Sequence, residues 1–370
     1  MPIRSFIAML LLTPLTLAQE TAPPLFAADT PIIDYQNPQL PGYGRIGMVV
    51  SPEKLAGDIG LDMLKQGGNA IDAAVATGFA LAVTLPRAGN LGGGGFMLVH
   101  LAESDEQIFI DYRETAPAGA SRDMFLNADG TVNKSKAYFS RQAAGVPGTV
   151  AGLIHAQSKY GTLPLATVIQ PAIDLAEQGF DTPLALHMSL TSRAERLAMD
   201  PEAKRVYLQG TANAPAPGAL FKQPDLAHTL QRIRDKGRDG FYGGETAALI
   251  AADMAANDGL ITADDLAGYR TLERSPVRGT FNEFEIVSVA PPSSGGIHIL
   301  QMLNLLEPYP LKSYGHNSAE YLHRLIESMK LAYADRSRYL GDPDQTVVPT
   351  EALISKDYAD ERRQLINANR

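Results

Sequence analysis

The sequence predicts a folded protein of the α+β class, built as one mixed unit with a helical middle region at about residues 145–270. Hydrophobic residues make up 45% of the 370 residues and charged residues 20%, which is the composition of a globular protein and not of a disordered or fibrous one. Short segments with strand character flank a long stretch whose apolar residues recur at helical spacing. No internal repeat or low-complexity linker divides the chain.

Two helices are expected before the first strands. Ser51 is a suitable N-cap for the first, because Pro52 then takes the first helical position and apolar residues follow at intervals of four. Asn69 is the expected cap of the second, which covers residues 70–83 and is rich in alanine and glycine. Small side chains bury surface only when the backbone lies close to a neighbour, so we expect this second helix in the interior.

Two strands at residues 96–101 and 107–112 should form a hairpin, because the residues between them are polar and turn-forming. A second pair of strands, at residues 277–281 and 283–290, follows the helical region. Asn317 is the expected cap of a long helix after that pair.

Acidic residues outnumber basic ones, since 41 Asp and Glu stand against 32 Lys and Arg and give a net charge of −9. The basic residues are scattered and form no stripe, so we expect no nucleic-acid partner and no membrane partner. The sequence has no cysteine, which excludes disulfides, thiol nucleophiles and cysteine-ligated metals.

The N-terminus has the pattern of a secretory signal peptide. Arg4 supplies a short positive region, residues 6–17 are mainly apolar, and Ala18 is the expected cleavage point. The apolar run is too short for a membrane span, which needs about 20 residues. We therefore expect residues 1–18 to be a signal peptide, residues 19–42 an extended arm, and the protein to be periplasmic or secreted.

Two local motifs have simpler explanations than a ligand site or a catalytic group. Gly92–Gly95 follows a helix and precedes a strand, which is the wrong order for a phosphate-binding loop, so we expect close backbone packing or close approach of a ligand there. Ser51 and Lys54 match the Ser-x-x-Lys of penicillin-recognising enzymes, but the Lys-Thr-Gly of those enzymes is missing. Neither the seven histidines nor the Asp342 region has the spacing of a metal site.

Arg113 is the strongest candidate for a binding residue. It directly follows a predicted strand, and loops at strand ends commonly present ligand-binding groups. A guanidinium can hold a carboxylate through two parallel hydrogen bonds. The alternative is a salt bridge to Asp111, two residues earlier on the same face of the strand, and the pattern alone leaves both open.

Several motifs together resemble the γ-glutamyltransferases, also called γ-glutamyltranspeptidases. The resemblance runs in order from about residue 47 to about residue 360. Its motifs are NLGGGGFM at 90–97, DYRETAP at 111–117, GVPGTVAG at 145–152, DDLAGY at 264–269, ERSPV at 273–277, PPSSGG at 291–296, ESMKLAYADR at 327–336 and YLGDP at 339–343.

The resemblance implies an N-terminal-nucleophile hydrolase, made as a precursor that cuts itself into a large and a small subunit. The two subunits form a four-layer αββα sandwich, and residues 43–370 resemble the large subunit. The family's nucleophile is a threonine that begins the small subunit. No segment here matches the family's Thr-Thr-His cleavage point, so we expect no catalytic residue in this chain, which alone should be inactive.

The resemblance also implies a substrate and a role for Arg113. That residue matches the family's arginine that binds the α-carboxylate of the γ-glutamyl group, and Glu114 is a possible second contact, either to Arg113 or to the substrate amine. The reaction is transfer of the γ-glutamyl group of glutathione and related compounds to water, amino acids or peptides. It needs neither a metal nor an organic cofactor.

Three other functions remain open from the sequence. A glutaryl or cephalosporin acylase on the same scaffold would also use an arginine to hold its acid. A non-catalytic periplasmic binding protein would lack the threonine-led partner chain. A Ser-x-x-Lys acylase would use Ser51.

Overall fold

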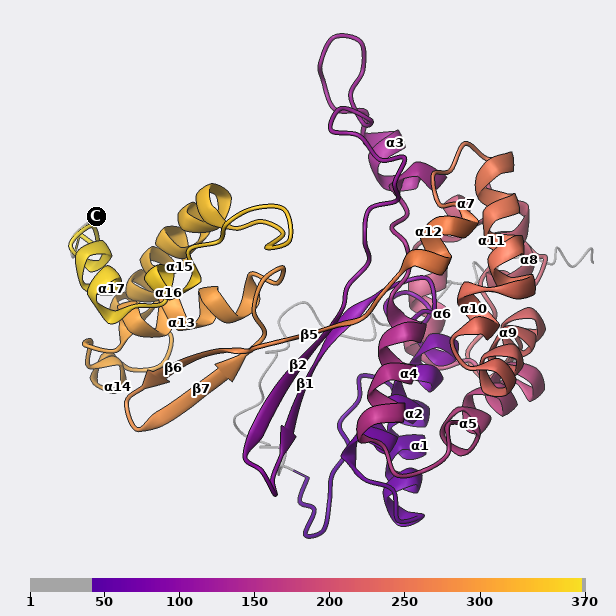
Figure 1. Cartoon of the computed structure of the whole chain (residues 1–370), viewed down its shortest axis with the longest axis horizontal. Helices are drawn as coiled ribbons and strands as arrows, with labels where there is room; N and C mark the ends of the chain where they lie inside the picture. The colour runs from indigo at the N-terminus through magenta and orange to yellow at the C-terminus, as the bar shows by residue number, and fades with distance from the viewer. Residues whose placement is uncertain (1–41, 368–370) are drawn as a thin grey trace, which may run out of the picture. The chain divides into compact units, whose positions relative to one another are not determined.

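The computed structural model describes residues 42–367 (Figure 1). The chain divides into two compact units, Met1–Met48 and Val49–Arg370. All helices and strands of the described residues lie in the second unit. The predicted signal peptide and residues 19–41 of the predicted arm lie outside the described residues. No helix among residues 42–367 is both long and apolar enough to span a membrane.

Among the described residues, two hairpin strands follow the first two helices, two short strands interrupt the helical middle region, and three strands precede the last helices. The strands are β1 (Gly95–Leu101), β2 (Glu106–Tyr112), β3 (Phe180–Asp181), β4 (Leu220–Phe221), β5 (Leu272–Arg274), β6 (Val277–Phe281) and β7 (Phe284–Ser288). The helices up to the middle of the chain are α1 (Lys54–Lys65), α2 (Ala70–Thr84), α3 (Lys134–Phe139), the 3-10 helix η1 (Arg141–Ala143), α4 (Thr149–Tyr160), α5 (Leu165–Gln178), α6 (Leu184–Thr191), α7 (Ala194–Leu197) and α8 (Pro201–Tyr207). The later helices are α9 (Pro224–Lys236), α10 (Asp239–Tyr242), α11 (Gly244–Ala256), α12 (Ala263–Gly268), α13 (Gly295–Leu306), α14 (Leu311–Tyr314), α15 (Ala319–Tyr339), α16 (Thr350–Leu353) and α17 (Lys356–Arg363).

The predicted hairpin is confirmed, and a third strand extends it. β1 and β2 pair antiparallel with Gly95 opposite Tyr112, and β5 pairs antiparallel with the other edge of β2, so that Phe109 faces Arg274. β6 and β7 form the second predicted pair, in a separate two-stranded sheet. No strand was expected at β5, because its three residues acquire strand structure only by pairing with β2.

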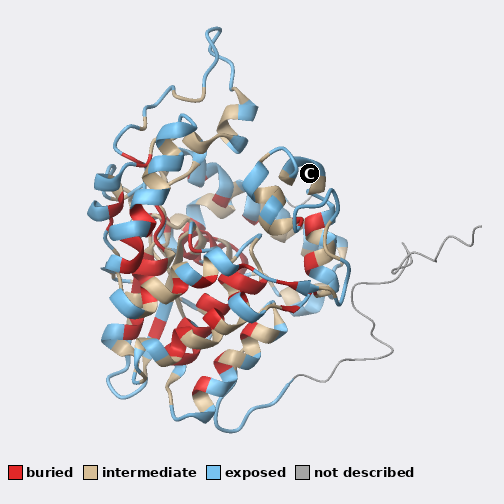
Figure 2. Ribbon diagram, turned by 90° about the vertical axis from the view of Figure 1, so that its right-hand side faces the viewer, coloured by how far each residue is buried: buried red, intermediate tan, exposed pale blue. Residues whose placement is uncertain are grey.

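The interior position of α2 is also confirmed. Asn69 caps this helix as expected, and its side chain forms a capping box with Asp72. Eleven of the fifteen helical residues are buried. Figure 2 shows that buried residues are concentrated on the helices in the interior of the fold. Burial acts to raise the pKa of Asp72, but hydrogen bonds from Thr162, Gln157, Leu163 and Asn69 outweigh it and lower the pKa.

Two predicted caps are wrong by one or two residues. α1 is capped by Glu53, whose carboxylate accepts the amide hydrogen of Ala56 at 3.0 Å, and not by Ser51. The longer side chain of glutamate reaches the free amide from a position nearer the helix. α15 is capped by Ser318 and not by Asn317, whose φ of 57° places it in the left-handed region outside the helix.

Two hydrophobic cores hold these elements together. The larger one gathers apolar residues of α2, α4, α5, α9, β1 and β2 around Phe79. The smaller one is built on Val277, Ile297, Leu300 and Leu353, from β6, α13 and α16. Because β5 joins the sheet of the first core and lies only two residues before β6, it connects the two cores along the chain.

The side chain of Glu273 fastens β5 to the C-terminal end of α4. It accepts hydrogen bonds from His155 at 2.7 Å, Lys159 at 2.5 Å and Tyr160 at 2.8 Å. Burial acts to raise the pKa of Glu273, but these three bonds lower it to about 2. The carboxylate is therefore ionised at neutral pH and holds β5 against α4.

Candidate functional site

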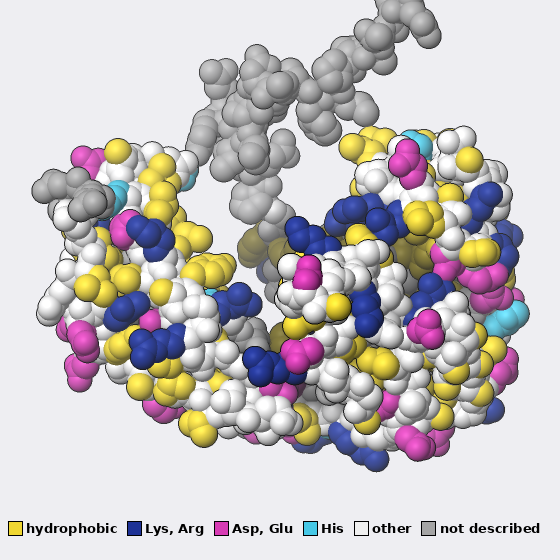
Figure 3. All heavy atoms as spheres, turned by 90° about the horizontal axis from the view of Figure 1, so that it is seen from above, with side chains coloured by type: hydrophobic (Ala, Val, Ile, Leu, Met, Phe, Trp, Pro, Cys, Tyr) yellow, Lys and Arg dark blue, Asp and Glu magenta, His cyan; other side chains and the backbone are white. Residues whose placement is uncertain are grey.

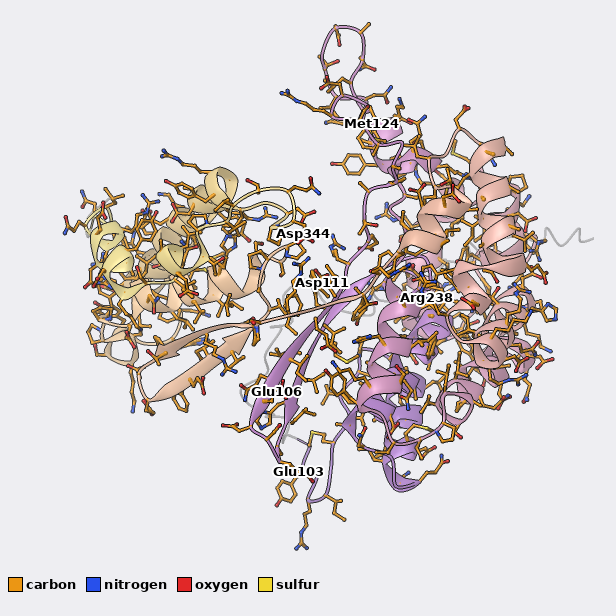
Figure 4. The ribbon with its side chains drawn as sticks, viewed as in Figure 1. Glu103, Glu106, Asp111, Met124, Arg238 and Asp344 are labelled. Atoms are coloured by element: carbon orange, nitrogen blue, oxygen red, sulfur yellow. The ribbon has the colours of Figure 1, made fainter. Side chains whose placement is uncertain are left out.

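A cavity of about 170 Å³ lies at the end of β2, and Arg113 forms part of its wall. Its lining comes from four parts of the chain that are far apart in sequence. These are Asp111 and residues 113–116 at the end of β2, four residues around β5 (Tyr269, Arg270, Leu272 and Arg274), Pro292 before α13, and the pair Asp342 and Asp344 after α15. Figure 4 shows Asp111 and Asp344 on neighbouring parts of the ribbon.

The backbone of Arg113 is held on both sides. Its N–H donates to Oδ1 of Asp111 at 3.1 Å, and its carbonyl accepts the hydroxyl of Tyr269 at 2.9 Å. Tyr269 is buried and stacks on Tyr242, with ring centroids 5.6 Å apart and an interplanar angle of 9°. Burial raises the pKa of Tyr269, so its hydroxyl keeps the proton that it donates.

The guanidinium of Arg113 remains exposed. Its side chain is 58% exposed, and Nη1 donates to Oε2 of Glu114 at 2.6 Å. Within residues 42–367 this is its one carboxylate contact, and an ion pair this exposed is weak and readily replaced. A ligand carboxylate can therefore bind the guanidinium of Arg113 without first breaking a buried hydrogen bond or ion pair. Glu114 thus makes the first of its two expected contacts, that with Arg113.

The expected alternative, a salt bridge between Arg113 and Asp111, is wrong. Asp111 is paired instead with Arg274, whose Nε donates to Oδ2 at 2.8 Å. Arg274 also donates from both Nη atoms to Asp344, at 3.1 Å and 2.6 Å. The hydrogen bonds with Asp344 are the main reason why the pKa of Arg274 is raised, and they lower the pKa of Asp344.

The glycine-rich loop packs against the strand end that carries Arg113, as expected. A Cβ atom on Gly94 would lie 2.6 Å from the carbonyl oxygen of Tyr112 and 2.7 Å from the amide nitrogen of Glu114. The carbonyl of Gly93 accepts the amide hydrogens of Gly148 at 2.8 Å and Thr149 at 3.0 Å. The loop therefore requires glycine for close approach of backbones.

Ser51 lacks the surroundings of an activated nucleophile. Lys54, the candidate base, pairs with Asp58 at 2.5 Å, and the hydrogen bond to Asp58 raises the pKa of Lys54. A base must be neutral to accept a proton from serine, so this pairing works against catalysis. Among the residues that the structure describes, no group of three His, Asp or Glu side chains could hold a metal ion.

A larger cavity, of about 610 Å³, lies beside α2, α8 and α9 and contains Arg205 and Lys222. Arg205 is already held by Glu202 at 2.6 Å and by Asp225 at 2.5 Å. Its guanidinium is therefore less available than that of Arg113, and the smaller cavity remains the better candidate site.

The sequence predicted Arg113 and named Asp111 only as its alternative ion-pair partner, and it missed Tyr269, Arg274 and Asp344. Tyr269, Arg274 and the residues before Asp344 stand in motifs quoted above for the family resemblance. Those motifs mark the segments as parts of the family resemblance, but they do not show that the segments lie next to one another in the fold.

Comparison with known proteins identifies the family. The family model described as gamma-glutamyltranspeptidase matches residues 56–370. The chain belongs to this family. A glutathione hydrolase proenzyme of Escherichia coli K12 is 46% identical over 324 residues, which cover 88% of this chain and 56% of that protein. The chain thus spans about half the length of the curated relatives it matches.

Solved structures agree with the gamma-glutamyltranspeptidase assignment. The gamma-glutamyltranspeptidase of Helicobacter pylori superposes with a TM-score of 0.87 at 43% identity, covering 90% of this chain and 95% of that one. The expected fold class, α+β of the N-terminal-nucleophile hydrolase type, is thereby confirmed. An acylase ACY 1 proenzyme of Pseudomonas sp. strain SE83 is also similar, 42% identical over 341 residues that cover 90% of this chain and 61% of that protein.

Proposed function

We propose that this gamma-glutamyltranspeptidase chain is the large-subunit part of an enzyme that cleaves the γ-glutamyl bond of glutathione and related compounds. The observation that supports it most is Arg113, whose backbone is fixed at both ends while its guanidinium stays exposed in a cavity. Planar recognition of a carboxylate needs such a fixed, accessible fork.

The reaction proceeds through a covalent intermediate on a second chain. The hydroxyl of a threonine at the start of the small subunit attacks the γ-amide carbonyl, and its proton passes to the departing amine. The resulting γ-glutamyl ester is then attacked by water, an amino acid or a peptide, which takes the γ-glutamyl group and returns the proton to threonine. Arg113 holds the α-carboxylate in both steps, and the mechanism uses no cofactor.

The remaining parts of the proposal concern the partner and the compartment. The small subunit from the same precursor completes the αββα sandwich and brings the nucleophile to the cavity. Residues 1–18 direct export, which places the enzyme in the periplasm or outside the cell. On the face seen in Figure 3, Lys and Arg side chains are interspersed with Asp and Glu side chains, which suits a small-molecule substrate better than a nucleic acid.

A glutaryl or cephalosporin acylase is the second candidate, because an acylase proenzyme is among the similar proteins. The two functions differ in the donor, since a glutaryl group has the terminal carboxylate but no α-amine. Arg113 can hold either acid, so substrate comparison has to separate them.

The test is hydrolysis by the protein expressed from its full-length gene, with γ-glutamyl, glutaryl and 4-aminobutyryl anilides as donors. We expect the γ-glutamyl donor to be cleaved best, and Arg113→Lys to lower its kcat/KM by roughly ten- to a hundredfold, as for a lost charge-assisted bond. For the 4-aminobutyryl donor, which lacks the α-carboxylate, Arg113→Lys should lower kcat/KM much less. A wild-type preference for the glutaryl donor would favour the acylase instead.

A further inference from the structure

Asp111 is a buried carboxylate placed next to the arginine that is to bind the ligand. Its side chain is only 6% exposed, and Oδ1 already lies 3.1 Å from the backbone nitrogen of Arg113. A buried ionised carboxylate needs a cationic partner, because desolvation without one is costly. The Arg113 side chain is long enough to fold back and become that partner, which would remove it from the ligand.

Arg274 prevents this by using all three nitrogen atoms of its guanidinium. Nε holds Asp111 at 2.8 Å, while Nη1 and Nη2 hold Asp344 at 3.1 Å and 2.6 Å. Its side chain is 19% exposed, so these bonds are partly shielded from water. One guanidinium thereby holds two of the carboxylates that line the cavity.

We propose that Arg274 is a positioning residue that keeps the guanidinium of Arg113 available for the ligand carboxylate, by holding Asp111 and Asp344 away from it. This inference rests on the proposed function, in which Arg113 binds the α-carboxylate of the donor. Arg274 does not touch the ligand. Because Arg274 binds these carboxylates, the guanidinium of Arg113 stays available, and this raises the affinity for an acidic donor.

A purely structural role makes a different prediction. If Arg274 only ties β5 to β2 and to the loop at Asp344, any variant that loses these bonds should be impaired. If it protects Arg113 from Asp111, then removing the charge of Asp111 should restore donor binding. Asp111→Asn suits this purpose, because asparagine retains an oxygen that accepts the Arg113 amide hydrogen but carries no charge.

The experiment measures kcat and KM for a γ-glutamyl donor with the full-length protein. Arg274→Gln should raise KM about tenfold or more, the size of a lost charge-assisted interaction, with kcat within about threefold of the wild type. Arg274→Gln combined with Asp111→Asn should return KM to within about threefold of the wild type. The matched control is Arg278→Gln, since Arg278 on β6 pairs with the exposed Glu285 on β7, donates to the side chain of Gln107 on β2, and does not line the cavity. That variant should leave KM within about twofold.

Two outcomes would overturn the inference. One is an unchanged KM in Arg274→Gln, and the other is a double variant as impaired as the single one. If Arg274→Gln does not fold, the double variant decides alone, because it buries no unpaired charge. If the double variant has the KM of the wild type, the inference is supported. If its KM is raised tenfold, the inference is contradicted.

Failure of the proposed function would look different. In that case the wild type would not cleave the γ-glutamyl donor, or Arg113→Lys would not affect it. An active wild type that depends on Arg113, with either overturning result at Arg274, would leave the function standing and remove only this inference.

Discussion

At Arg113 the protein combines a rigid backbone with an accessible side chain. Asp111 and Tyr269 hold the amide hydrogen and the carbonyl, so the Cα–Cβ direction is set before a ligand arrives. Binding of a carboxylate then has to order the side chain of Arg113 but not its backbone. The hydroxyl of Tyr269 should therefore contribute to donor affinity although it lies behind Arg113.

We expect Tyr269→Phe to raise KM for a γ-glutamyl donor by about two- to tenfold, the range for one lost neutral hydrogen bond. The phenyl ring keeps its stack on Tyr242, so the packing is retained. Tyr242→Phe is the matched control, since it removes a buried hydroxyl that donates to the carbonyl of Pro147 at 2.7 Å. Both variants should lower the melting temperature, but only Tyr269→Phe should raise KM by more than twofold. Equal KM values in the two variants would exclude a specific role for the Tyr269 hydroxyl.

The sequence alone identifies Arg113 as a candidate binding residue, but it does not decide whether its guanidinium pairs with Asp111 or with a ligand. Its position after a predicted strand and its place in a family motif both depend on neighbouring residues only. The choice between Asp111 and a ligand depended on Arg274, which lies far along the chain and reaches Asp111 because β5 pairs with β2. No local pattern contains that information.

At the scale of elements, α4 is placed by glycines that let it approach β2. A Cβ atom on Gly152 would overlap the ring of Tyr112, and one on Gly148 would overlap the carbonyl oxygen of Tyr112 and the hydroxyl of Tyr269. Tyr112 is the residue immediately before Arg113. The contact between helix and strand therefore also fixes where the strand ends and the binding residue begins.

Gly152→Ala should destabilise the protein by about 1–3 kcal/mol, because the added methyl group forces a shift in a packed contact. Gly57→Ala is the matched control, since Gly57 also lies inside a helix but its Cβ would meet only the Cβ of Ser51, at 3.4 Å. Alanine at that position should be neutral or stabilise by up to about 1 kcal/mol, because it favours the helix. Chemical denaturation of both variants measures the difference. A Gly152→Ala variant as stable as Gly57→Ala would show that α4 can move away from Tyr112 without cost.

Elements with strong local signals could be predicted from the sequence, and those that depend on distant pairing could not. The β1–β2 hairpin and the buried α2 follow from alternation, turn residues and small side chains. The caps of α1 and α15 shifted because Glu53 and Ser318, respectively, compete with the expected residues for the same free amides. β5 has three residues and two of them are charged, so only its partner strand makes it a strand.

At the scale of the whole molecule, the candidate site is assembled from segments that the chain brings together over long distances. The cavity uses the end of β2, the region of β5 and the loop after α15. A relative such as the Escherichia coli glutathione hydrolase proenzyme is nearly twice as long as its matched part, since the match covers 56% of it. In the proposed enzyme, the nucleophile belongs to the part of the precursor that this chain does not include.

The most direct test is intact-mass and N-terminal analysis of the protein purified after expression from its full-length gene, together with hydrolysis of a γ-glutamyl donor by the same sample. We predict two chains, the smaller beginning with threonine, and release of glutamate from the donor. A single uncut chain that binds glutamate-like ligands without cleaving the donor would contradict the account and indicate a binding protein on the same scaffold.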